Sequence, residues 1–225
     1  MAEYASPNFV LFGGTFDPIH EGHVGVVRGL LLRPDIQKVF LVPAGKNPFK
    51  GEGARLPAQL RLEMASRAVA GITGATVLDL ELARGGPSYS IDTVTALASQ
   101  YPRANLKLAL GWDVYETFRD WRNASELLEL ATLLVVLRRG STTPRSGKPH
   151  QWLAGLPANW RDRLRMGANG GAIEPKGRTV VEFVNLRLPR VSSSQIRSNR
   201  ELARVPAEAR NLLAQYWAWE NAHGA

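Results

Sequence analysis

Residues Phe12-Gly13-Gly14-Thr15-Phe16-Asp17-Pro18-Ile19-His20-Glu21-Gly22-His23 decide the fold expected for this chain of 225 residues. The stretch follows a short apolar run that predicts a buried strand, and its two glycines allow a tight turn and a close approach to a ligand. The Asp-Pro pair is typical of a turn, and the residues after it have the composition of a helix. Two histidines three apart share the start of that helix, where free amide groups and the helix dipole favour an anion. The order of strand, glycine turn, paired imidazoles and helix start therefore predicts a phosphate site.

Short apolar runs alternate with helical patterns along the chain, which is typical of an α/β fold. Most of these runs are apolar on both faces, as strands of a covered parallel sheet are. The expected strands are residues 9–11, 39–42, 76–80, 106–110, 132–137 and 180–184, and the expected helices are residues 22–32, 57–70, 89–99 and 125–130. We expect a Rossmann-like, doubly wound parallel sheet with helices on both faces and a C-terminal helical extension. Ligands of such sheets bind at the carboxyl ends of the strands, where Gly13, Pro43 and Gly111 fall.

The alternation breaks at residues 140–178, where stretches rich in Gly, Ser, Thr and Pro flank a Trp-containing segment. We interpret this part as a mobile insertion with a small helix near residues 160–165, acting either as a lid or as an inert surface segment. Helical patterns return over residues 192–220, and Pro206 opens the last helix. The aromatic residues Tyr216, Trp217 and Trp219 indicate helix packing or an oligomer contact.

Composition narrows the class of protein. An apolar fraction of 44% with six tryptophans is typical of a globular chain, and the absence of cysteine excludes disulfides, iron–sulfur clusters and thiolate chemistry. The net charge of +8 comes from basic residues scattered among 20 acidic ones, without zinc-finger spacing or an aromatic RNA-binding signature. This pattern favours a solvated surface, or a substrate with several phosphates, over nucleic acid. No signal-peptide pattern and no membrane-length apolar run occur, so we expect no membrane association and a cytoplasmic location.

A second candidate phosphate cradle lies near the C-terminus, at Val191-Ser192-Ser193-Ser194-Gln195-Ile196-Arg197. Hydroxyl groups and free amides at a helix start, followed by an arginine one turn later, suit a phosphate group. A simple capping cluster is the alternative interpretation of the three serines.

Both stretches resemble signatures of the nucleotidyltransferase superfamily, namely His-x-Gly-His and Ile-Ser-Ser-Thr-x-Ile-Arg. The middle of the chain is similar to the bacterial nicotinate-mononucleotide adenylyltransferases. The matching segments are Pro87-Ser88-Tyr89-Ser90-Ile91-Asp92-Thr93, Gly111-Trp112-Asp113, Phe118 with Trp121, and Arg138-Arg139-Gly140. The resemblance implies a single nucleotidyltransferase domain over residues 1–225. It also implies that ATP and nicotinate mononucleotide react to give nicotinate adenine dinucleotide and pyrophosphate, without a protein nucleophile.

The resemblance further implies roles for individual residues. His20, His23 and Arg197 are the expected catalytic residues, with both histidines donating hydrogen bonds to ATP phosphates. The residues expected to bind ATP are Gly13, Gly14, Thr15, Phe16, His20, His23, Asp113, Arg138, Ser193, Ser194 and Arg197. Asp113 would contact the ribose, or would merely cap the helix that follows it. Magnesium is the expected cofactor, bridging phosphate oxygens with few protein ligands.

On the acceptor side, the residues expected to bind substrate are Lys46, Lys50, Ser90, Thr93 and Trp121. Trp121 would stack on the pyridine ring or else belong to the core, and the two hydroxyls would receive the pyridine carboxylate. Phe49 stands where the family commonly has a histidine, so the role of that histidine is lost or is taken by one of the lysines.

Two other functions remain open at this point. The same reaction could use another phosphorylated acceptor, such as nicotinamide mononucleotide or phosphopantetheine. Alternatively, the basic charge and Phe49 fit a nucleotide-binding protein without catalysis. The partners expected from the first interpretation are the small-molecule substrates ATP and nicotinate mononucleotide, with a possible homo-oligomer.

Overall fold

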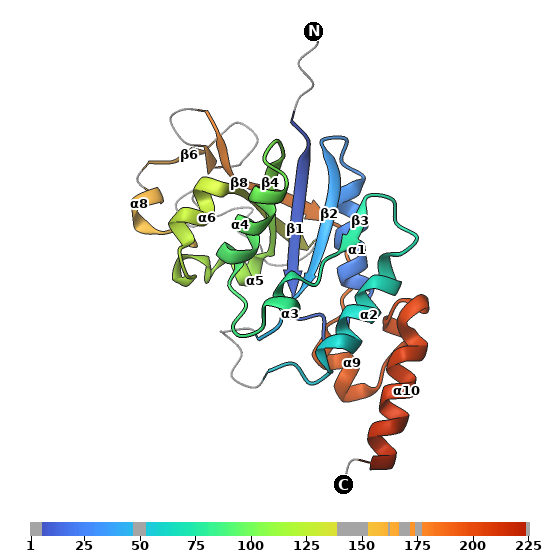
Figure 1. Cartoon of the computed structure of the whole chain (residues 1–225). Helices are drawn as coiled ribbons and strands as arrows, with labels where there is room; N and C mark the ends of the chain where they lie inside the picture. The colour runs from blue at the N-terminus through green and yellow to red at the C-terminus, as the bar shows by residue number, and fades with distance from the viewer. Residues whose placement is uncertain are drawn as a thin grey trace. The chain divides into compact units, whose positions relative to one another are not determined.

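The computed structural model describes residues 6–46, 53–138, 153–161, 163–166, 172–173 and 177–223 (Figure 1). The chain divides into two compact units, which are described separately. The sheet unit is drawn from Met1–Phe12, Asp35–Gln37 and Tyr89–Arg187, and the histidine unit from Gly13–Pro34, Lys38–Ser88 and Leu188–Ala225. The expectation of a single domain over residues 1–225 stays a prediction.

Parallel strands form the framework of the sheet unit. Its strands are β1 (Asn8–Gly14, which ends in the histidine unit), β4 (Asn105–Gly111), β5 (Ala131–Arg138), β6 (Arg165–Met166), β7 (Ala172–Ile173) and β8 (Thr179–Leu186). β4 pairs in parallel with β1 and β5, β5 pairs in parallel with β8, and β7 and β6 continue the sheet in antiparallel orientation. Leu133, Leu134 and Val135 of β5 are fully buried. Successive buried side chains are expected of a parallel strand that is covered on both faces.

Helices of the sheet unit bury one apolar face each. They are α4 (Ser90–Gln100), α5 (Trp112–Tyr115), the 3₁₀ helix η1 (Phe118–Asp120), α6 (Ala124–Leu130) and α8 (Ala158–Arg161). Ile91, Val94 and Leu97 of α4 are buried as their spacing predicts, and α4 packs against α6. The small helix expected near residues 160–165 is present as α8, but it ends at Arg161, and Arg165 belongs to β6.

The histidine unit contains the first helix and the C-terminal helices. Its elements are α1 (Glu21–Leu31), β2 (Ile36–Pro43, which begins in the sheet unit), α2 (Ala58–Val69), β3 (Ala75–Val77), α3 (Leu80–Arg84), α9 (Ser193–Asn199), the 3₁₀ helix η2 (Leu202–Arg204) and α10 (Ala207–His223). β2 and β3 are parallel, and α2 packs against α10. The strand expected over residues 76–80 is too long, because Leu80 already begins α3. The sequence Leu-Glu-Leu-Ala-Arg that follows Asp79 consists of strong helix formers, which explains this difference.

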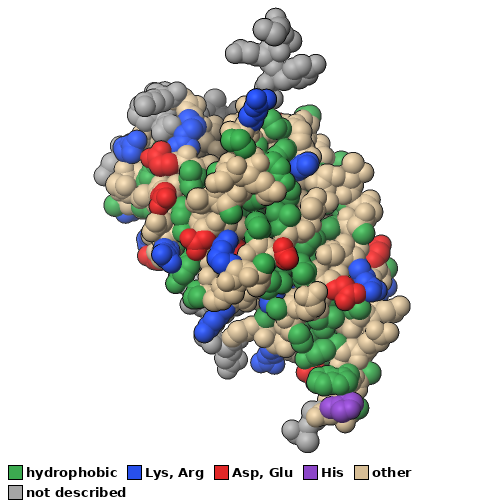
Figure 2. All heavy atoms as spheres, in the orientation of Figure 1, with side chains coloured by type: hydrophobic (Ala, Val, Ile, Leu, Met, Phe, Trp, Pro, Cys, Tyr) green, Lys and Arg blue, Asp and Glu red, His purple; other side chains and the backbone are tan. Residues whose placement is uncertain are grey.

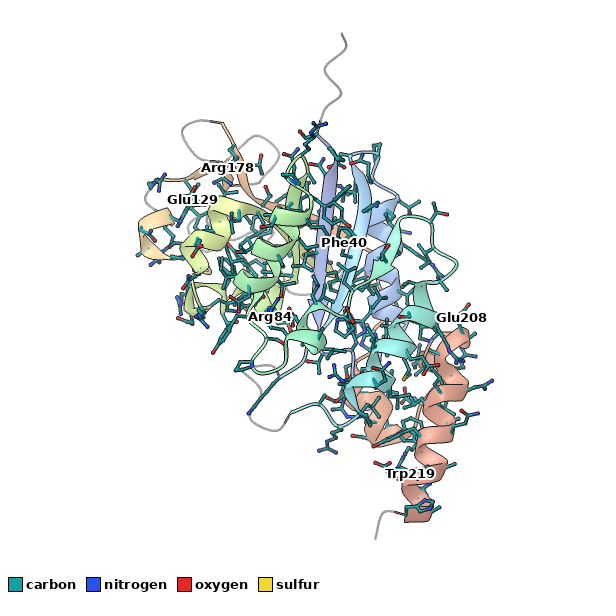
Figure 3. The ribbon with its side chains drawn as sticks, viewed as in Figure 1. Phe40, Arg84, Glu129, Arg178, Glu208 and Trp219 are labelled. Carbon is teal, nitrogen blue, oxygen red and sulfur yellow. The ribbon has the colours of Figure 1, made fainter. Side chains whose placement is uncertain are left out.

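Burial separates the aromatic residues of α10 into two groups. Trp217 is buried, and the guanidinium group of Arg200 lies over its ring at 4.6 Å from the centroid. For Trp217, helix packing is therefore confirmed as the role, out of the two expected alternatives of helix packing and an oligomer contact. Trp219, by contrast, is 58% exposed near the C-terminal end of α10 (Figure 3).

The insertion contributes to the core of the sheet unit. Within its described part, Leu153, Leu156 and Trp160 are buried, and Arg163 and Arg178 both lie over the indole of the tryptophan. Arg178 also pairs with Glu129 of α6 at 3.7 Å. The interpretation of residues 140–178 as mobile, and as a lid or an inert segment, stays a prediction.

The expected fold class is confirmed: the chain forms a Rossmann-like, doubly wound parallel sheet with helices, including a C-terminal helical extension. Basic and acidic side chains are interspersed over the face shown in Figure 2. No helix in the described part of the chain is long and apolar enough to cross a membrane.

Candidate active site

The end of β1 brings the backbone close to an aromatic ring. A side chain at Gly14 would place its Cβ 2.9 Å from the ring of Phe16, so this position excludes larger residues. Phe16 is buried with a φ of 48°, and its ring meets that of His23 edge to face at 5.0 Å. The glycine turn therefore fixes Phe16, and Phe16 in turn supports one of the two histidines.

His20 and His23 cap helix α1 reciprocally. The backbone N–H of His23 donates to Nδ1 of His20 at 3.3 Å, and the backbone N–H of His20 donates to Nδ1 of His23 at 3.2 Å. The two rings are stacked with centroids 3.6 Å apart. A Cβ at Gly22 would lie 3.0 Å from the ring of His20, which explains the glycine between the histidines.

This reciprocal cap also assigns the tautomers of the histidines. A neutral imidazole whose Nδ1 accepts a hydrogen bond carries its hydrogen on Nε2. Both rings are therefore neutral donors at Nε2, stacked at the N-terminus of a helix whose dipole favours negative charge. Such a pair suits phosphate oxygens.

Helix α9 brings the second motif to the same turn. Ser192 is its N-cap and accepts a hydrogen bond from the backbone N–H of Gln195, which confirms a capping role for this first serine. Ser193 Oγ donates to the carbonyl oxygen of Pro18 at 2.9 Å. Arg197 reaches Asp17, which is 180 residues away in sequence, so the structure brings the two predicted motifs together.

Sequence reasoning missed two buried charged residues in this region. Asp17 is 6% exposed, and its carboxylate accepts from the backbone N–H groups of Arg55 and Leu56 at 3.0 and 2.8 Å. Arg61 is 2% exposed and donates to the carbonyl oxygens of Thr15, Ala44 and Leu56 at 2.7, 2.8 and 3.2 Å. Desolvation lowers the pKa of Arg61, and the nearby charge of Asp17 acts in the opposite direction. Together these two side chains hold the loops around the glycine turn.

Of the basic residues predicted to bind the substrates, Lys46 is described, whereas Lys50 and the side chain of Arg138 are not. Lys46 is exposed, and its carbonyl oxygen accepts from the backbone N–H of Ser88. Lys50 and Phe49 lie outside the described residues. Arg138 ends β5, and its side chain is likewise outside the described part.

Two of the predicted acceptor residues, Ser90 and Thr93, belong to helix α4 of the sheet unit. Ser90 begins α4, Tyr89 is its N-cap residue, and Thr93 is fully buried one turn later. Arg122 places its guanidinium carbon 4.6 Å from the centroid of the Tyr89 ring. Trp121 is half-buried, and its ring packs against Phe118 with centroids 5.4 Å apart. The structure thus brings an exposed cation to the start of the helix that carries the predicted carboxylate contacts.

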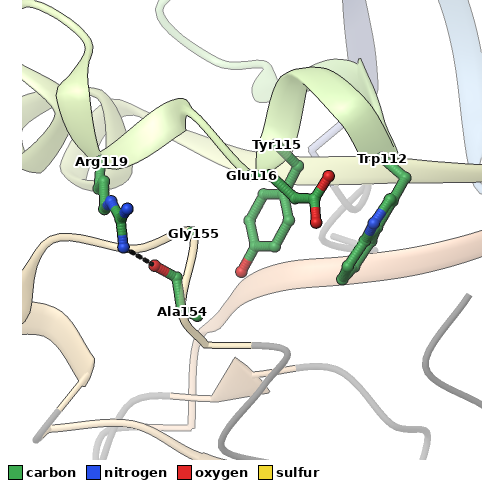
Figure 4. A pocket seen from close by; sticks show the side chains of 6 residues that line it. All are labelled: Trp112, Tyr115, Glu116, Arg119, Ala154 and Gly155. Carbon is green, nitrogen blue, oxygen red and sulfur yellow. Dashed lines mark hydrogen bonds between the residues drawn. The ribbon is translucent and has the colours of Figure 1, made fainter. Parts of the chain in front are cut away.

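A cavity of about 230 Å³ opens in the sheet unit, and one of its lining residues, Trp112, directly precedes the predicted ribose contact Asp113 in sequence (Figure 4). Its lining residues are Trp112, Tyr115, Glu116, Arg119, Ala154 and Gly155. Burial raises the pKa of Tyr115, and Arg119 donates to the carbonyl oxygen of Ala154 at 3.3 Å. Asp113 lies in the first turn of α5 and is exposed.

The glycine turn, the stacked histidines and the arginine on α9 lie around one turn of the histidine unit, the arrangement expected of a nucleotidyltransferase. The sequence model of the cytidylyltransferase-like family matches residues 11–199, and the chain belongs to this family.

Two curated relatives give a narrower comparison, and both are named "probable nicotinate-nucleotide adenylyltransferase". The protein of Maridesulfovibrio salexigens is 40% identical over 128 residues, which are 57% of this chain and 59% of that protein. The protein of Leptospira borgpetersenii is 38% identical over 141 residues, which are 61% of this chain and 71% of that protein. The match therefore spans less than two thirds of the first relative.

A solved structure extends the likeness of the fold over most of the chain. Nicotinic acid mononucleotide adenylyltransferase of Plasmodium falciparum, complexed with NaAD, matches 93% of this chain and 96% of its own with a TM-score of 0.65. The sequence identity of 15% means that this comparison shows the fold alone.

Proposed function

We propose that the protein transfers the adenylyl group of ATP to nicotinate mononucleotide, which gives nicotinate adenine dinucleotide and pyrophosphate and serves NAD biosynthesis. A phosphate oxygen of the acceptor bonds to the α-phosphorus of ATP as the bond to the β-phosphate oxygen breaks. The observation that carries this proposal is the reciprocal cap of His20 and His23, because it prepares two neutral hydrogen-bond donors at a helix N-terminus. The identity of the acceptor is inferred from the names of the two curated relatives.

Each part of the site has a role in this reaction. His20 and His23 stabilise the negative charge that builds on the transferring phosphoryl group, and Arg197 holds the outer phosphates. Gly13, Gly14, Thr15 and Phe16 bring the backbone to the nucleotide, Asp113 contacts the ribose, and Ser193, Ser194 and Arg138 complete the ATP contacts. Lys46, Lys50 and Trp121 bind the acceptor. No residue needs to form a covalent intermediate, since positioning and charge stabilisation supply the rate.

Magnesium enters with ATP. Within the described ranges, no group of three or more His, Asp or Glu side chains is placed to hold a metal ion. A Mg²⁺ ion bound by phosphate oxygens and water needs few protein ligands, and its charge would neutralise the leaving pyrophosphate. Because the reaction consumes ATP, we place the protein in the cytoplasm.

The acceptor preference is tested by pyrophosphate release from ATP and Mg²⁺ with three acceptors in parallel: nicotinate mononucleotide, nicotinamide mononucleotide and phosphopantetheine. We expect kcat/KM for the acid to exceed that for the amide by about tenfold or more, because a helix N-terminus and a guanidinium group both favour a carboxylate. Faster release with the amide or with phosphopantetheine would change the acceptor and keep the reaction. Binding of ATP without release from any acceptor would show a non-catalytic protein.

Arg122 is expected to contribute to this preference. Its guanidinium group sits over Tyr89 at the start of α4, where Ser90 and Thr93 are proposed to receive the pyridine carboxylate. Arg122→Gln should lower the acid-over-amide ratio of kcat/KM by about two- to fivefold, as expected for an exposed charge. The matched control is Arg103→Gln, an exposed arginine of the same unit, which should leave the ratio unchanged. An unchanged ratio in the Arg122 variant would remove this residue from the carboxylate site.

A further inference from the structure

Asp17 is buried and bound by donors from two directions. Two backbone N–H groups, those of Arg55 and Leu56, donate to its carboxylate oxygens. Arg197 lies on the other side, with Nη1 at 3.1 Å from Oδ2 of Asp17. The same Nη1 also donates to the backbone carbonyl oxygen of Asp17. A carboxylate held in this way cannot turn without breaking several bonds at once.

The anchoring uses one nitrogen of the guanidinium group of Arg197. Nη1 makes both bonds to Asp17, whereas the bond of Nη2 within the described part of the chain is a long one, 3.4 Å to Ser194 Oγ. Nε is buried and has no hydrogen-bond partner among the described residues. Nε–H and Nη2–H lie on one edge of the planar group and form a fork that matches two oxygens of a phosphate. A buried donor left without an acceptor costs free energy, so this edge is prepared for a ligand.

From this geometry we propose that Asp17 is a positioning residue for Arg197. It fixes Nη1 against the turn that precedes the histidines and thereby presents the Nε–Nη2 edge to two oxygens of the ATP polyphosphate. The inference rests on the proposed function in one respect, since it takes ATP as the ligand. It does not depend on the identity of the acceptor.

Preorganisation is the physical benefit of this arrangement. A free arginine side chain has many rotamers, and ordering it on binding costs free energy that a fixed side chain has already lost on folding. The carboxylate also compensates the positive charge of Arg197 at the buried end of the site. Asp17 touches no reacting atom, so its effect on the reaction passes through Arg197.

The test combines Asp17→Asn with Arg197→Lys in a double-mutant cycle. Asparagine keeps the size of the side chain and removes its charge, while lysine keeps the charge of Arg197 and removes the fork. We expect each single variant to weaken the binding of inorganic tripolyphosphate, and to lower kcat/KM for ATP, by about 10- to 100-fold, as for a charged hydrogen bond. The binding of adenosine should stay unchanged. The double variant should be little worse than Arg197→Lys alone, because both changes remove one interaction.

Glu182→Gln is the matched control, since this acid pairs with Lys107 at 2.8 Å in the sheet unit, whereas Asp17 and Arg197 belong to the histidine unit. It should leave tripolyphosphate binding unchanged. Additive losses in the cycle, or an Asp17 variant that binds tripolyphosphate as the unmodified protein does, would overturn the proposal.

Two further outcomes keep the proposal separate from folding and from the acceptor. If Asp17→Asn lacks a cooperative unfolding transition and therefore does not fold, the proposal is tested by Arg197→Lys alone. Unchanged tripolyphosphate binding in Arg197→Lys would show that the Nε–Nη2 edge is not used and would overturn the proposal. Tripolyphosphate binding needs no pyridine nucleotide. Weakened binding in both variants would therefore support the role of Asp17 even if nicotinate mononucleotide proves not to be the acceptor.

Discussion

Replacing His20 or His23 by alanine is expected to lower kcat for pyrophosphate release by about 10²- to 10³-fold, the effect of removing one preorganised donor to a developing negative charge. The reciprocal cap holds both rings as neutral Nε2–H donors, and stacking fixes their relative orientation. Neither ring has to reorganise during the reaction. Initial rates at saturating ATP and nicotinate mononucleotide measure the loss in kcat, and single-turnover rates separate the chemical step from product release.

An alanine variant of His20 loses both the helix cap and the proposed phosphate donor. An asparagine variant separates the loss of stability from the loss of activity. His20→Ala also removes the N-cap acceptor for the backbone N–H of His23, which costs about 1 kcal/mol of stability. Asparagine is a good N-cap residue, so His20→Asn should keep the thermal stability and still lose the activity. A His20→Asn variant with the activity of the unmodified protein would show that the histidine serves the helix alone.

Local patterns predicted the parts of the fold in which local and tertiary preferences agree. Helix α1 begins where the glycine turn and the histidine pair indicate it, and β5 is buried on both faces as its uninterrupted apolar run predicts. The strand expected over residues 76–80 failed because an apolar run of four or five residues fits a short strand and a helix start equally well. Here the helix propensity of Leu80–Arg84 decides the outcome.

The contacts of the site were less predictable than its residues. Resemblance to the two superfamily motifs pointed to His20, His23 and Arg197, but not to the way in which the structure joins them. Histidine is not among the preferred N-cap residues, so a reciprocal histidine cap cannot be read from propensity. Asp17 and Arg197 are 180 residues apart in sequence, so their pairing depends on tertiary packing alone.

The burial of Arg61 is indicated by its position in the sequence of α2. This residue stands at the head of the stripe formed by Met64, Ala65 and Ala68, which are all buried on α2. A charged residue at an apolar position of a helix is expected to have specific partners, because burying an unpaired charge is costly. Two of its three carbonyl acceptors, on Thr15 and Ala44, come from loops that no local pattern connects to α2, whereas Leu56 directly precedes the N-cap residue of this helix.

Arg61→Ala is accordingly expected to lower the free energy of unfolding by about 3–5 kcal/mol, the usual cost of breaking a buried charged network. Three carbonyl oxygens, two of them in buried bonds, lose the guanidinium donor at once, and the loops that carry Thr15 and Ala44 lose their common anchor. Arg61→Lys should recover part of this loss, because an ammonium group keeps the charge and cannot reach all three acceptors in one geometry. The matched control is Arg67→Ala on the same helix, where an exposed pair with Glu63 should contribute about 0.5 kcal/mol or less. Urea unfolding of the three variants measures these differences through the midpoint at constant slope. An Arg61→Ala protein as stable as the Arg67→Ala control would show that water replaces the guanidinium group, and that the loops around the glycine turn need no internal anchor.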